Sequence, residues 1–236
     1  MRRQPLDLVF LPGLSSDAQV WRHQLTIFRK LYSVQVIPLV QFSCLRKMIA
    51  YVLSVVPEQF VLIGHSLGGW IAIEVMKCAA KKVKGLILLN TTARPESHLN
   101  KIWRKNLIQR AKKEHFKKVI LPLMPIYLPS NETINKDLHD ELLKMFLRLG
   151  RNVFIRQQKI IINRPGSLYD LKKIKCPTLI IHAENDKIMD REMQEEMQKE
   201  ISNSRIESIE NCGHFSMLNQ PREVSNIMKY WLSKHI

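Results

Sequence analysis

The feature that most constrains the fold is an alternation of short apolar runs with longer helical patterns. Strands buried on both faces have continuous apolar sequences, and residues 85–89, Gly-Leu-Ile-Leu-Leu, are of this kind. Strands separated by helices pair in parallel, because a parallel connection needs a long crossover. We therefore expect an α/β fold with a mostly parallel, doubly wound sheet of about six strands. The expected strands cover residues 6–11, 33–37, 60–63, 83–89, 177–181 and 205–209.

Residues 91–175, here called the insertion segment, interrupt this alternation. Their apolar residues recur with helical spacing, and prolines divide the expected helices. We interpret the segment as a helical insertion between the fourth and fifth strands, so that residues 1–90 and 176–236 form the core. The expected helices lie around 103–107, 115–121 and 138–149, and the dividing prolines are Pro122, Pro125 and Pro129.

A G-x-S-x-G motif, Gly64-His65-Ser66-Leu67-Gly68, lies directly between an expected strand and an expected helix. In this context the motif predicts a sharp, strained turn that presents the serine hydroxyl above the sheet. The glycines are needed because side chains there would collide with neighbouring backbone. The helix that follows points its amino terminus at the turn, which favours developing negative charge. Ser66 is therefore the candidate nucleophile.

A serine hydroxyl is a weak nucleophile until a base removes its proton, so a histidine is required. Of the eight histidines, His214 lies in a loop between the last expected strand and the last expected helix. Such a loop is at the carboxyl edge of the sheet, beside the serine turn. His182, at the end of an apolar strand, is the alternative, whereas His65 is expected to point away from Ser66 and to be structural.

The histidine in turn needs a carboxylate that holds its tautomer and stabilises the imidazolium. Asp186 follows the fifth expected strand by a few residues, again at the carboxyl edge. Glu184 and Asp190 are the alternatives. We expect Asp186 to contact His214.

The order Ser66, Asp186, His214 resembles that of the α/β-hydrolase superfamily, over nearly the whole chain. The resemblance implies an α/β-hydrolase fold with a helical cap insertion. It also implies an oxyanion hole made by the backbone amides of Leu67 and Leu14, the latter following Pro12-Gly13, where many relatives have His-Gly. Two segments, Arg156-Gln157-Gln158 and Arg164-Pro165-Gly166-Ser167, resemble cap segments of esterase and lactonase-like members. Trp21 and Arg156 are the candidate substrate-binding residues.

A serine at this turn excludes the branches of the superfamily that attack with an aspartate. What remains is hydrolysis of a carboxylic ester, thioester or lactone, hydrolysis of a carbon–carbon bond, or acyl transfer, because all use the same serine. Ester hydrolysis of a small molecule is the main hypothesis. A receptor-like binding protein that keeps the three residues is the alternative outside enzymes.

The chain has 37 basic and 21 acidic residues, a net charge of +16. The insertion segment holds 19 of the basic and 7 of the acidic residues, so it carries +12 of this charge. If these residues line the entrance, anionic esters or esters carried on an acidic protein would be steered there, as for pimeloyl-carrier-protein methyl ester esterases. The outer faces of the helices are the alternative position. The candidates at the entrance are Arg104, Lys105, Arg148, Arg151 and Arg156.

Other partners and cofactors are not expected. The basic helix around 101–113 lacks a nucleic-acid-reading module, and the chain has no phosphate-binding G-x-x-x-x-G-K motif and no metal-binding cluster. No apolar run is long enough to span a bilayer. Residues 1–10 resemble a signal peptide only superficially, so we expect a strand there and a cytoplasmic protein. The four cysteines are scattered singly, and we expect reduced, mostly buried thiols.

Overall fold

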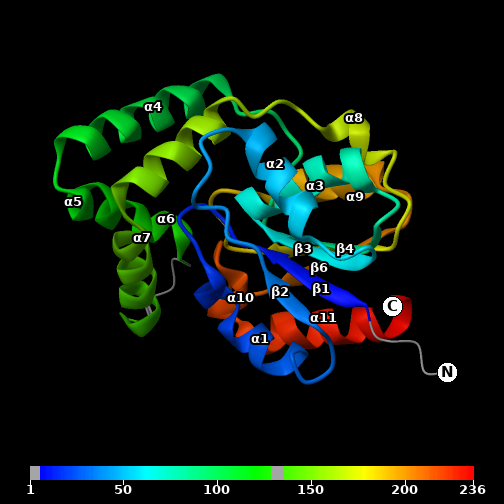
Figure 1. The fold of residues 1–236 in the computed structure, drawn as a ribbon. Helices are drawn as coiled ribbons and strands as arrows, with labels where there is room; N and C mark the ends of the chain where they lie inside the picture. Colours follow the sequence, from blue (N-terminus) through cyan, green and yellow to red (C-terminus); the bar gives the residue numbers. More distant parts are fainter. Residues whose placement is uncertain (1–5, 129–135) are drawn as a thin grey trace.

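The computed structural model describes residues 6–128 and 136–236, which form one six-stranded sheet with helices on both faces (Figure 1). All pairings are parallel, and the strand order is β2-β1-β3-β4-β5-β6. The predicted fold class is therefore confirmed. Met1 to Pro5 and Pro129, on which some of the expectations depend, lie outside the described residues. The strands are β1 (Asp7–Leu11), β2 (Val34–Val36), β3 (Phe60–His65), β4 (Val83–Leu89), β5 (Thr178–Ala183) and β6 (Ser204–Ile209).

The degree of burial differs between central and edge strands, and it explains why some strands are continuously apolar and others are not. Every residue of β3 and β5 is buried, which fits their continuous apolar sequences. The edge strands β2 and β6 are only partly buried, and β6 carries charged side chains. A short or charged edge strand discourages pairing with another chain. The sheet is therefore most apolar at its centre, where β3 delivers Ser66.

The helices cover the sheet as a doubly wound fold requires. On one face lie α2 (Leu45–Val55), α3 (Leu67–Ala79) and α9 (Arg191–Glu200), and on the other lie α1 (Arg22–Phe28) and α11 (Pro221–His235) (Figure 1). A 3-10 turn, Ala18–Trp21, precedes α1, and the short helix α10 (Ser216–Asn219) precedes α11. The sequence did not predict α9, because its ten residues are mostly charged or polar and bury only Gln194 and Met197.

The insertion segment forms the helices between β4 and β5, most of which lie beyond the sheet (Figure 1). Its long helix is broken at Gly150, whose φ of +83° is accessible mainly to glycine. As expected, Pro122 and Pro125 separate the helix that ends at Ile120 from the helix that begins at Lys136. Each occupies a first-turn position of a short element between them, where the missing N–H costs nothing. The elements are α4 (His98–Lys113), α5 (Phe116–Ile120), a 3-10 turn (Leu121–Leu123), α6 (Met124–Tyr127), α7 (Lys136–Ile162) and α8 (Leu168–Leu171).

The end of the insertion segment packs on the core. Helix α8 contacts α9. The Ser167 hydroxyl donates to Glu74 Oε1 on α3 at 2.6 Å, and Lys77 Nζ lies 3.0 Å from Asp170 Oδ2. These contacts join α8 to the face of the sheet that α3 covers. The part that projects beyond the sheet is therefore α4 to α7.

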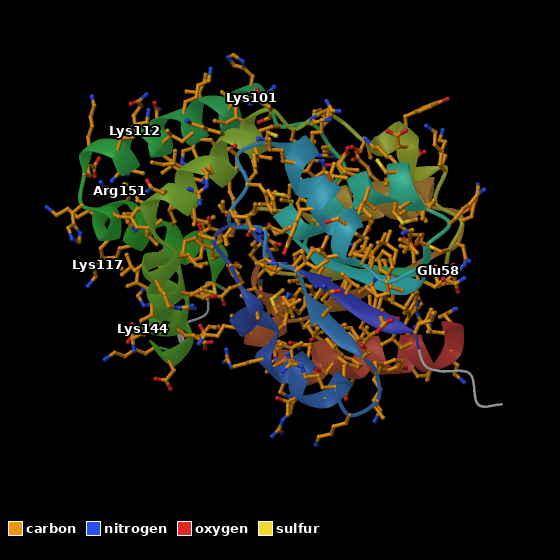
Figure 2. All side chains as sticks on the ribbon, viewed as in Figure 1. Glu58, Lys101, Lys112, Lys117, Lys144 and Arg151 are labelled. Atoms are coloured by element: carbon orange, nitrogen blue, oxygen red, sulfur yellow. The ribbon has the colours of Figure 1, made fainter. Side chains whose placement is uncertain are left out.

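Many basic side chains of α4 to α7 point outward, including the labelled Lys101, Lys112, Lys117 and Lys144 (Figure 2).

The cysteines are free, but the expectation that most are buried is wrong, because Cys44 and Cys78 are exposed. Within the described residues no helix is both long enough and apolar enough to cross a membrane.

The turn from β3 into α3 depends on close contact between backbones. A Cβ atom added to Gly68 would lie 2.1 Å from the carbonyl oxygen of Leu11 and 2.6 Å from that of Pro12. Both are backbone atoms, one from the last residue of β1 and one from the residue after it, so neither can move as the tip of a flexible side chain could. Glycine at 68 therefore lets α3 begin directly against the neighbouring strand.

We expect Gly68→Ala to lower the free energy of unfolding by about 3 kcal/mol, because overpacking against backbone forces the strand and helix apart. Urea denaturation followed by circular dichroism measures this. Gly166→Ala is the matched control, since the atoms nearest to its added Cβ belong to the Pro95 ring, the closest being Cδ at 3.2 Å. Equal loss of stability in the two variants would contradict the argument.

Candidate active site

Ser66 lies at the apex of the β3–α3 turn in a strained backbone conformation. Its φ is +52° and its ψ is −117°, a region that residues with a side chain rarely adopt. Its carbonyl accepts a hydrogen bond from Thr91 Oγ1 at 2.7 Å, which holds the turn against the end of β4. The half-buried Ser66 hydroxyl lies 2.9 Å from His214 Nε2. The motif thus places the hydroxyl where the sequence predicted, within reach of a base.

His214 follows β6 and is held by groups from several elements. Its Nδ1 lies 2.8 Å from Asp186 Oδ2, so its two ring nitrogens face Ser66 and Asp186. Its backbone N–H donates to the carbonyl of Tyr127 at 3.1 Å, and the Tyr127 ring lies 6.0 Å from the imidazole. Tyr127 belongs to α6 of the insertion segment. The position of His214 therefore depends on the inserted helices as well as on the sheet.

Asp186 is a buried carboxylate with several hydrogen-bond donors. Its Oδ1 accepts from the backbone amides of Ile188 and Met189 at 2.8 and 3.1 Å. Burial alone would raise its pKa, but the charge and hydrogen bond of His214, with these two amides, lower the pKa of Asp186 below its ordinary value. Of the alternatives, Glu184 is exposed and Asp190 caps α9 by accepting from the amide of Met193 at 2.9 Å. Asp186 is the carboxylate that the structure places on His214.

Asn90 was not found from the sequence, yet it orients Asp186. It follows β4 with a φ of +47°, and its Nδ2 donates to Asp186 Oδ2 at 3.0 Å. Its Oδ1 accepts from the Ser216 hydroxyl at 2.7 Å. An asparagine directly after a buried strand was the available signal, since asparagine adopts positive φ more readily than most residues.

His65 precedes Ser66 and is fully buried, as a structural role requires. Its Nε2–H donates to the carbonyl of His214 at 2.8 Å, and its Nδ1 has no partner among the described residues. Burial, followed by the neighbouring charge of His214, lowers the pKa of His65 to about 3. His65 is therefore neutral at physiological pH and fixes the backbone of His214.

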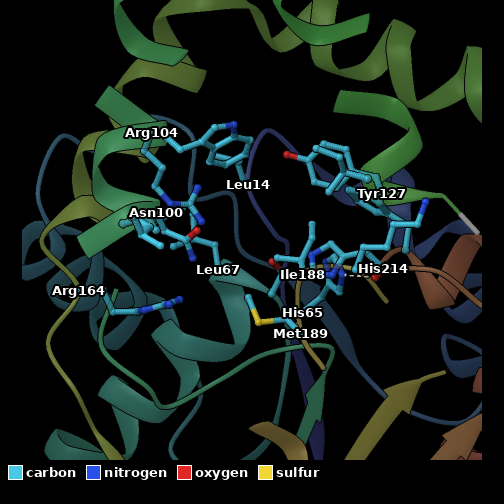
Figure 3. A pocket seen from close by; sticks show the side chains of 17 residues that line it. Leu14, His65, Leu67, Asn100, Arg104, Tyr127, Arg164, Ile188, Met189 and His214 are labelled. Atoms are coloured by element: carbon cyan, nitrogen blue, oxygen red, sulfur yellow. Dashed lines mark hydrogen bonds between the residues drawn. The ribbon is translucent and has the colours of Figure 1, made fainter. Parts of the chain in front are cut away.

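Ser66 and His214 line a cavity of about 420 Å³ (Figure 3). Leu14 and Leu67 line it, and the N–H of Leu67 has no acceptor within the helix because Leu67 is the first residue of α3. The next amide along the chain, that of Ser15, donates to Gln157 Oε1 on α7 at 2.7 Å. The insertion segment therefore holds the loop that presents Leu14. The remaining lining residues are His65, Leu99, Asn100, Trp103, Arg104, Ile126, Tyr127, Ile161, Arg164, Lys187, Ile188, Met189 and Phe215.

The structure does not bring the two expected substrate-binding residues to this cavity. Trp21 is fully buried, with its ring edge-on to Phe10 and His65. Arg156 points the other way, and its Nη2 donates to the carbonyl of Val40 at 2.8 Å. Both residues pack elements together, which their residue types alone could not reveal.

Of the five basic residues expected at the entrance, only Arg104 lines the cavity. Arg148 pairs with Asp17, and Arg151 donates to the carbonyl of Glu114. Lys105 is exposed on α4. Arg164, which the sequence analysis assigned to a cap-like segment but not to the entrance, is the other arginine of the lining.

The fold and the strained serine turn define a class, that of parallel α/β sheets with a serine at the turn after a central strand. The chain belongs to the alpha/beta hydrolase family, whose sequence model matches residues 8–227. This family membership was the resemblance inferred from the sequence, and it is confirmed.

Relatives with known activities match different shares of the chain. Mouse monoacylglycerol lipase ABHD6 is 34% identical over 91 residues, which are 37% of this chain and 27% of that protein. The chain thus matches about a quarter of the length of this lipase. The pimeloyl-[acyl-carrier protein] methyl ester esterase of Nitrosospira multiformis is 27% identical over 192 residues, or 78% of this chain and 72% of that one.

Solved structures are similar over almost the whole chain. A thermophilic esterase from Thermogutta terrifontis, solved with malate bound, has a TM-score of 0.87 at 25% identity, covering 99% of this chain and 92% of that one. MenH from S. aureus has a TM-score of 0.86 at 21% identity, covering 99% and 95%. At 21% identity, the similarity to MenH concerns the fold alone.

The buried, neutral His65 generates a prediction on pH and stability. Its pKa of about 3 lies below the ordinary value of 6.5, so between these values the unfolded chain takes up a proton that the folded chain does not. Stability from this group is complete above pH 6.5 and is lost as the pH falls. Relative to the wild type, His65→Gln should show a slope of unfolding free energy against pH that is shallower by about 1.4 kcal/mol per unit.

Urea denaturation between pH 4.5 and 6 measures this slope. His98→Gln, which changes an exposed histidine, is the control and should keep the wild-type slope. A His65→Gln slope equal to that of the wild type would show that His65 is protonated in the folded protein.

Proposed function

We propose that this chain is a carboxylic ester hydrolase that acts on small esters through Ser66, His214 and Asp186. The observation that carries the proposal is the continuous line of hydrogen bonds from Asp186 through His214 to Ser66, which ends in the cavity. The alpha/beta hydrolase family, the esterase relative matched over 78% of the chain and the esterase structure at 25% identity support ester cleavage.

The geometry suits covalent catalysis in two stages. Ser66 Oγ attacks the ester carbonyl while His214 Nε2 takes the hydroxyl proton, and Asp186 stabilises the imidazolium that forms. The carbonyl oxygen, now negatively charged, accepts hydrogen bonds from the amides of Leu14 and Leu67. His214 then gives the proton to the departing alcohol, which leaves an acyl-Ser66 ester.

Water completes the cycle in the second stage. His214 Nε2 removes a proton from a water molecule, which attacks the acyl-Ser66 carbonyl through the same oxyanion site. Collapse of this intermediate returns the proton to Ser66 and releases the carboxylic acid. The inserted helices α4, α6 and α7, whose residues line the cavity, would cover the ester during both stages.

One observation favours an ester carried on an acidic protein as a second candidate. The relative matched over most of the chain is a pimeloyl-[acyl-carrier protein] methyl ester esterase, and the outward face of the insertion segment is rich in lysine (Figure 2). A surface of that charge would attract an acidic carrier. The hydrolytic step would be the same.

We expect Ser66→Ala to abolish hydrolysis of short-chain 4-nitrophenyl esters and covalent labelling by a fluorescent organophosphonate. Both processes need the Ser66 oxygen as nucleophile. Absorbance assays and gel fluorescence measure them. Ser54→Ala is the matched control, because Ser54 is an exposed residue whose hydroxyl donates only to the carbonyl of Tyr51. Wild-type turnover by Ser66→Ala would overturn the proposed function.

Asp186→Asn should lower kcat for the same esters by a factor of about 10⁴, because an amide cannot stabilise the imidazolium and favours the wrong His214 tautomer. Asp190→Asn removes a carboxylate four residues away, which caps α9 and does not touch His214. It should leave kcat within about twofold of the wild type, since the asparagine Oδ1 can still accept the Met193 N–H and cap α9. Equal kcat for Asp186→Asn and Asp190→Asn would exclude Asp186 from the reaction.

A further inference from the structure

Two arginines of the insertion segment occupy the side of the cavity away from His214 (Figure 3). Arg104 comes from α4, and Arg164 follows the end of α7. Their exposed fractions are only 8% and 9%, although arginine is rarely buried unless it is paired. The proposed hydrolysis does not use either side chain, so their burial needs another explanation.

One carboxylate, Glu96, lies between the two guanidinium groups. Its Oε1 is 3.2 Å from Arg104 Nε, and its Oε2 is 3.1 Å from Arg164 Nη2. The side chain of Glu96 is completely buried. The Arg104–Glu96–Arg164 cluster therefore contains two positive charges and one negative charge, a net charge of +1.

The surroundings do not supply the missing negative charge. None of the described residues that line the cavity is acidic, and Lys187 adds a further positive charge. Asp186, the nearby carboxylate, is already bound to His214. The pKa of Arg164 lies below its ordinary value, because burial and the like charge of Arg104 lower it by more than Glu96 raises it. An uncompensated buried charge is costly, so this cluster is poised to gain from an added anion.

Hydrogen bonding within the cluster is also incomplete. Arg104 Nη1 donates to Gln158 Oε1 at 2.7 Å, but Arg104 Nε and Arg164 Nε have no hydrogen-bond partner among the described residues. Glu96 itself accepts no hydrogen bond of good geometry in that part of the chain, so its contacts with the arginines are electrostatic. Guanidinium groups pair with carboxylates through two parallel hydrogen bonds, which makes a carboxylate the fitting ligand.

We propose that Arg104 and Arg164 form a carboxylate-binding subsite, so that the preferred substrates are monoesters of dicarboxylic acids. This inference rests on the proposed ester hydrolysis at Ser66. The ester group lies at Ser66, the aliphatic chain crosses the apolar wall, and the free carboxylate binds the arginines. Leu67, Ile161 and Trp103 supply apolar surface to the same cavity.

Two esters with equal acyl length test the subsite. Monoethyl adipate and ethyl hexanoate both have six-carbon acyl groups, and only the first carries a carboxylate. The ratio of their kcat/KM values, measured by pH-stat titration, should fall roughly 10-fold to 100-fold in Arg164→Gln, the range for losing a hydrogen bond between charged groups. Arg104→Gln should change the ratio in the same direction. Each variant leaves Glu96 with one arginine, so the cluster is electrically balanced.

Arg151→Gln is the matched control, since it removes a charge from α7 at a residue outside the cavity lining. It should keep the wild-type ratio. An unchanged ratio in both Arg164→Gln and Arg104→Gln would overturn the subsite.

A binding experiment separates this inference from the proposed function. Calorimetric titration of the wild-type protein and of Arg164→Gln with adipate needs no turnover, and the wild type should bind adipate at least tenfold more tightly. Equal affinity of the two proteins for adipate, together with ester turnover that requires Ser66, would overturn the subsite alone. Tight adipate binding with wild-type turnover by Ser66→Ala would overturn the proposed function and leave an anion site.

Discussion

The arrangement of the whole molecule depends on how the His214 imidazole is held. Its ring must face a hydroxyl on one side and a carboxylate on the other, and these two groups are separated by 120 residues of sequence, from Ser66 to Asp186. A parallel sheet meets this requirement because the carboxyl ends of its strands lie at one edge. β3 delivers Ser66, β4 delivers Asn90, and the loop after β5 delivers Asp186. Strain at Ser66 and Asn90 is tolerated because the packed sheet fixes both turns.

The inserted helices are part of this arrangement and not an independent cover. The Tyr127 carbonyl accepts a hydrogen bond from the backbone N–H of His214. The Gln157 side chain accepts a hydrogen bond from the loop that presents Leu14 and donates one to the carbonyl of Leu39. Gln158 holds Arg104 in the wall of the cavity. Consequently the position of the insertion segment is mechanically connected to the proposed oxyanion site and to His214, the proposed base. A change in the packing of α6 or α7 would reach the reacting groups through backbone hydrogen bonds.

Features of the structure could be predicted from the sequence where they depend on neighbouring residues, and not where they depend on contacts between distant elements. Ser66 could be found because its turn requires local glycines, and His214 and Asp186 because parallel strands bring the ends of known segments together. The strands could be found because burial on both faces leaves a continuous apolar pattern. Trp21 and Arg156 were misplaced because the partner that each meets comes from another element. For the same reason Asn90 was missed and Arg164 was assigned to a cap-like segment but not to the cavity, since neither position follows from a pattern that local physics requires.

Charge shows most clearly why position matters more than composition. The insertion segment has a net charge of +12, but many of its lysines point into solvent, where ions screen them beyond about 8 to 10 Å. Arg104 and Arg164 are only two of its 19 basic residues, yet they are buried beside the cavity with a single carboxylate between them. Screening is weak there, and each unpaired charge or donor costs free energy until a ligand offsets it. The local imbalance at Glu96, and not the overall charge of the chain, is therefore the property that would select an anionic substrate.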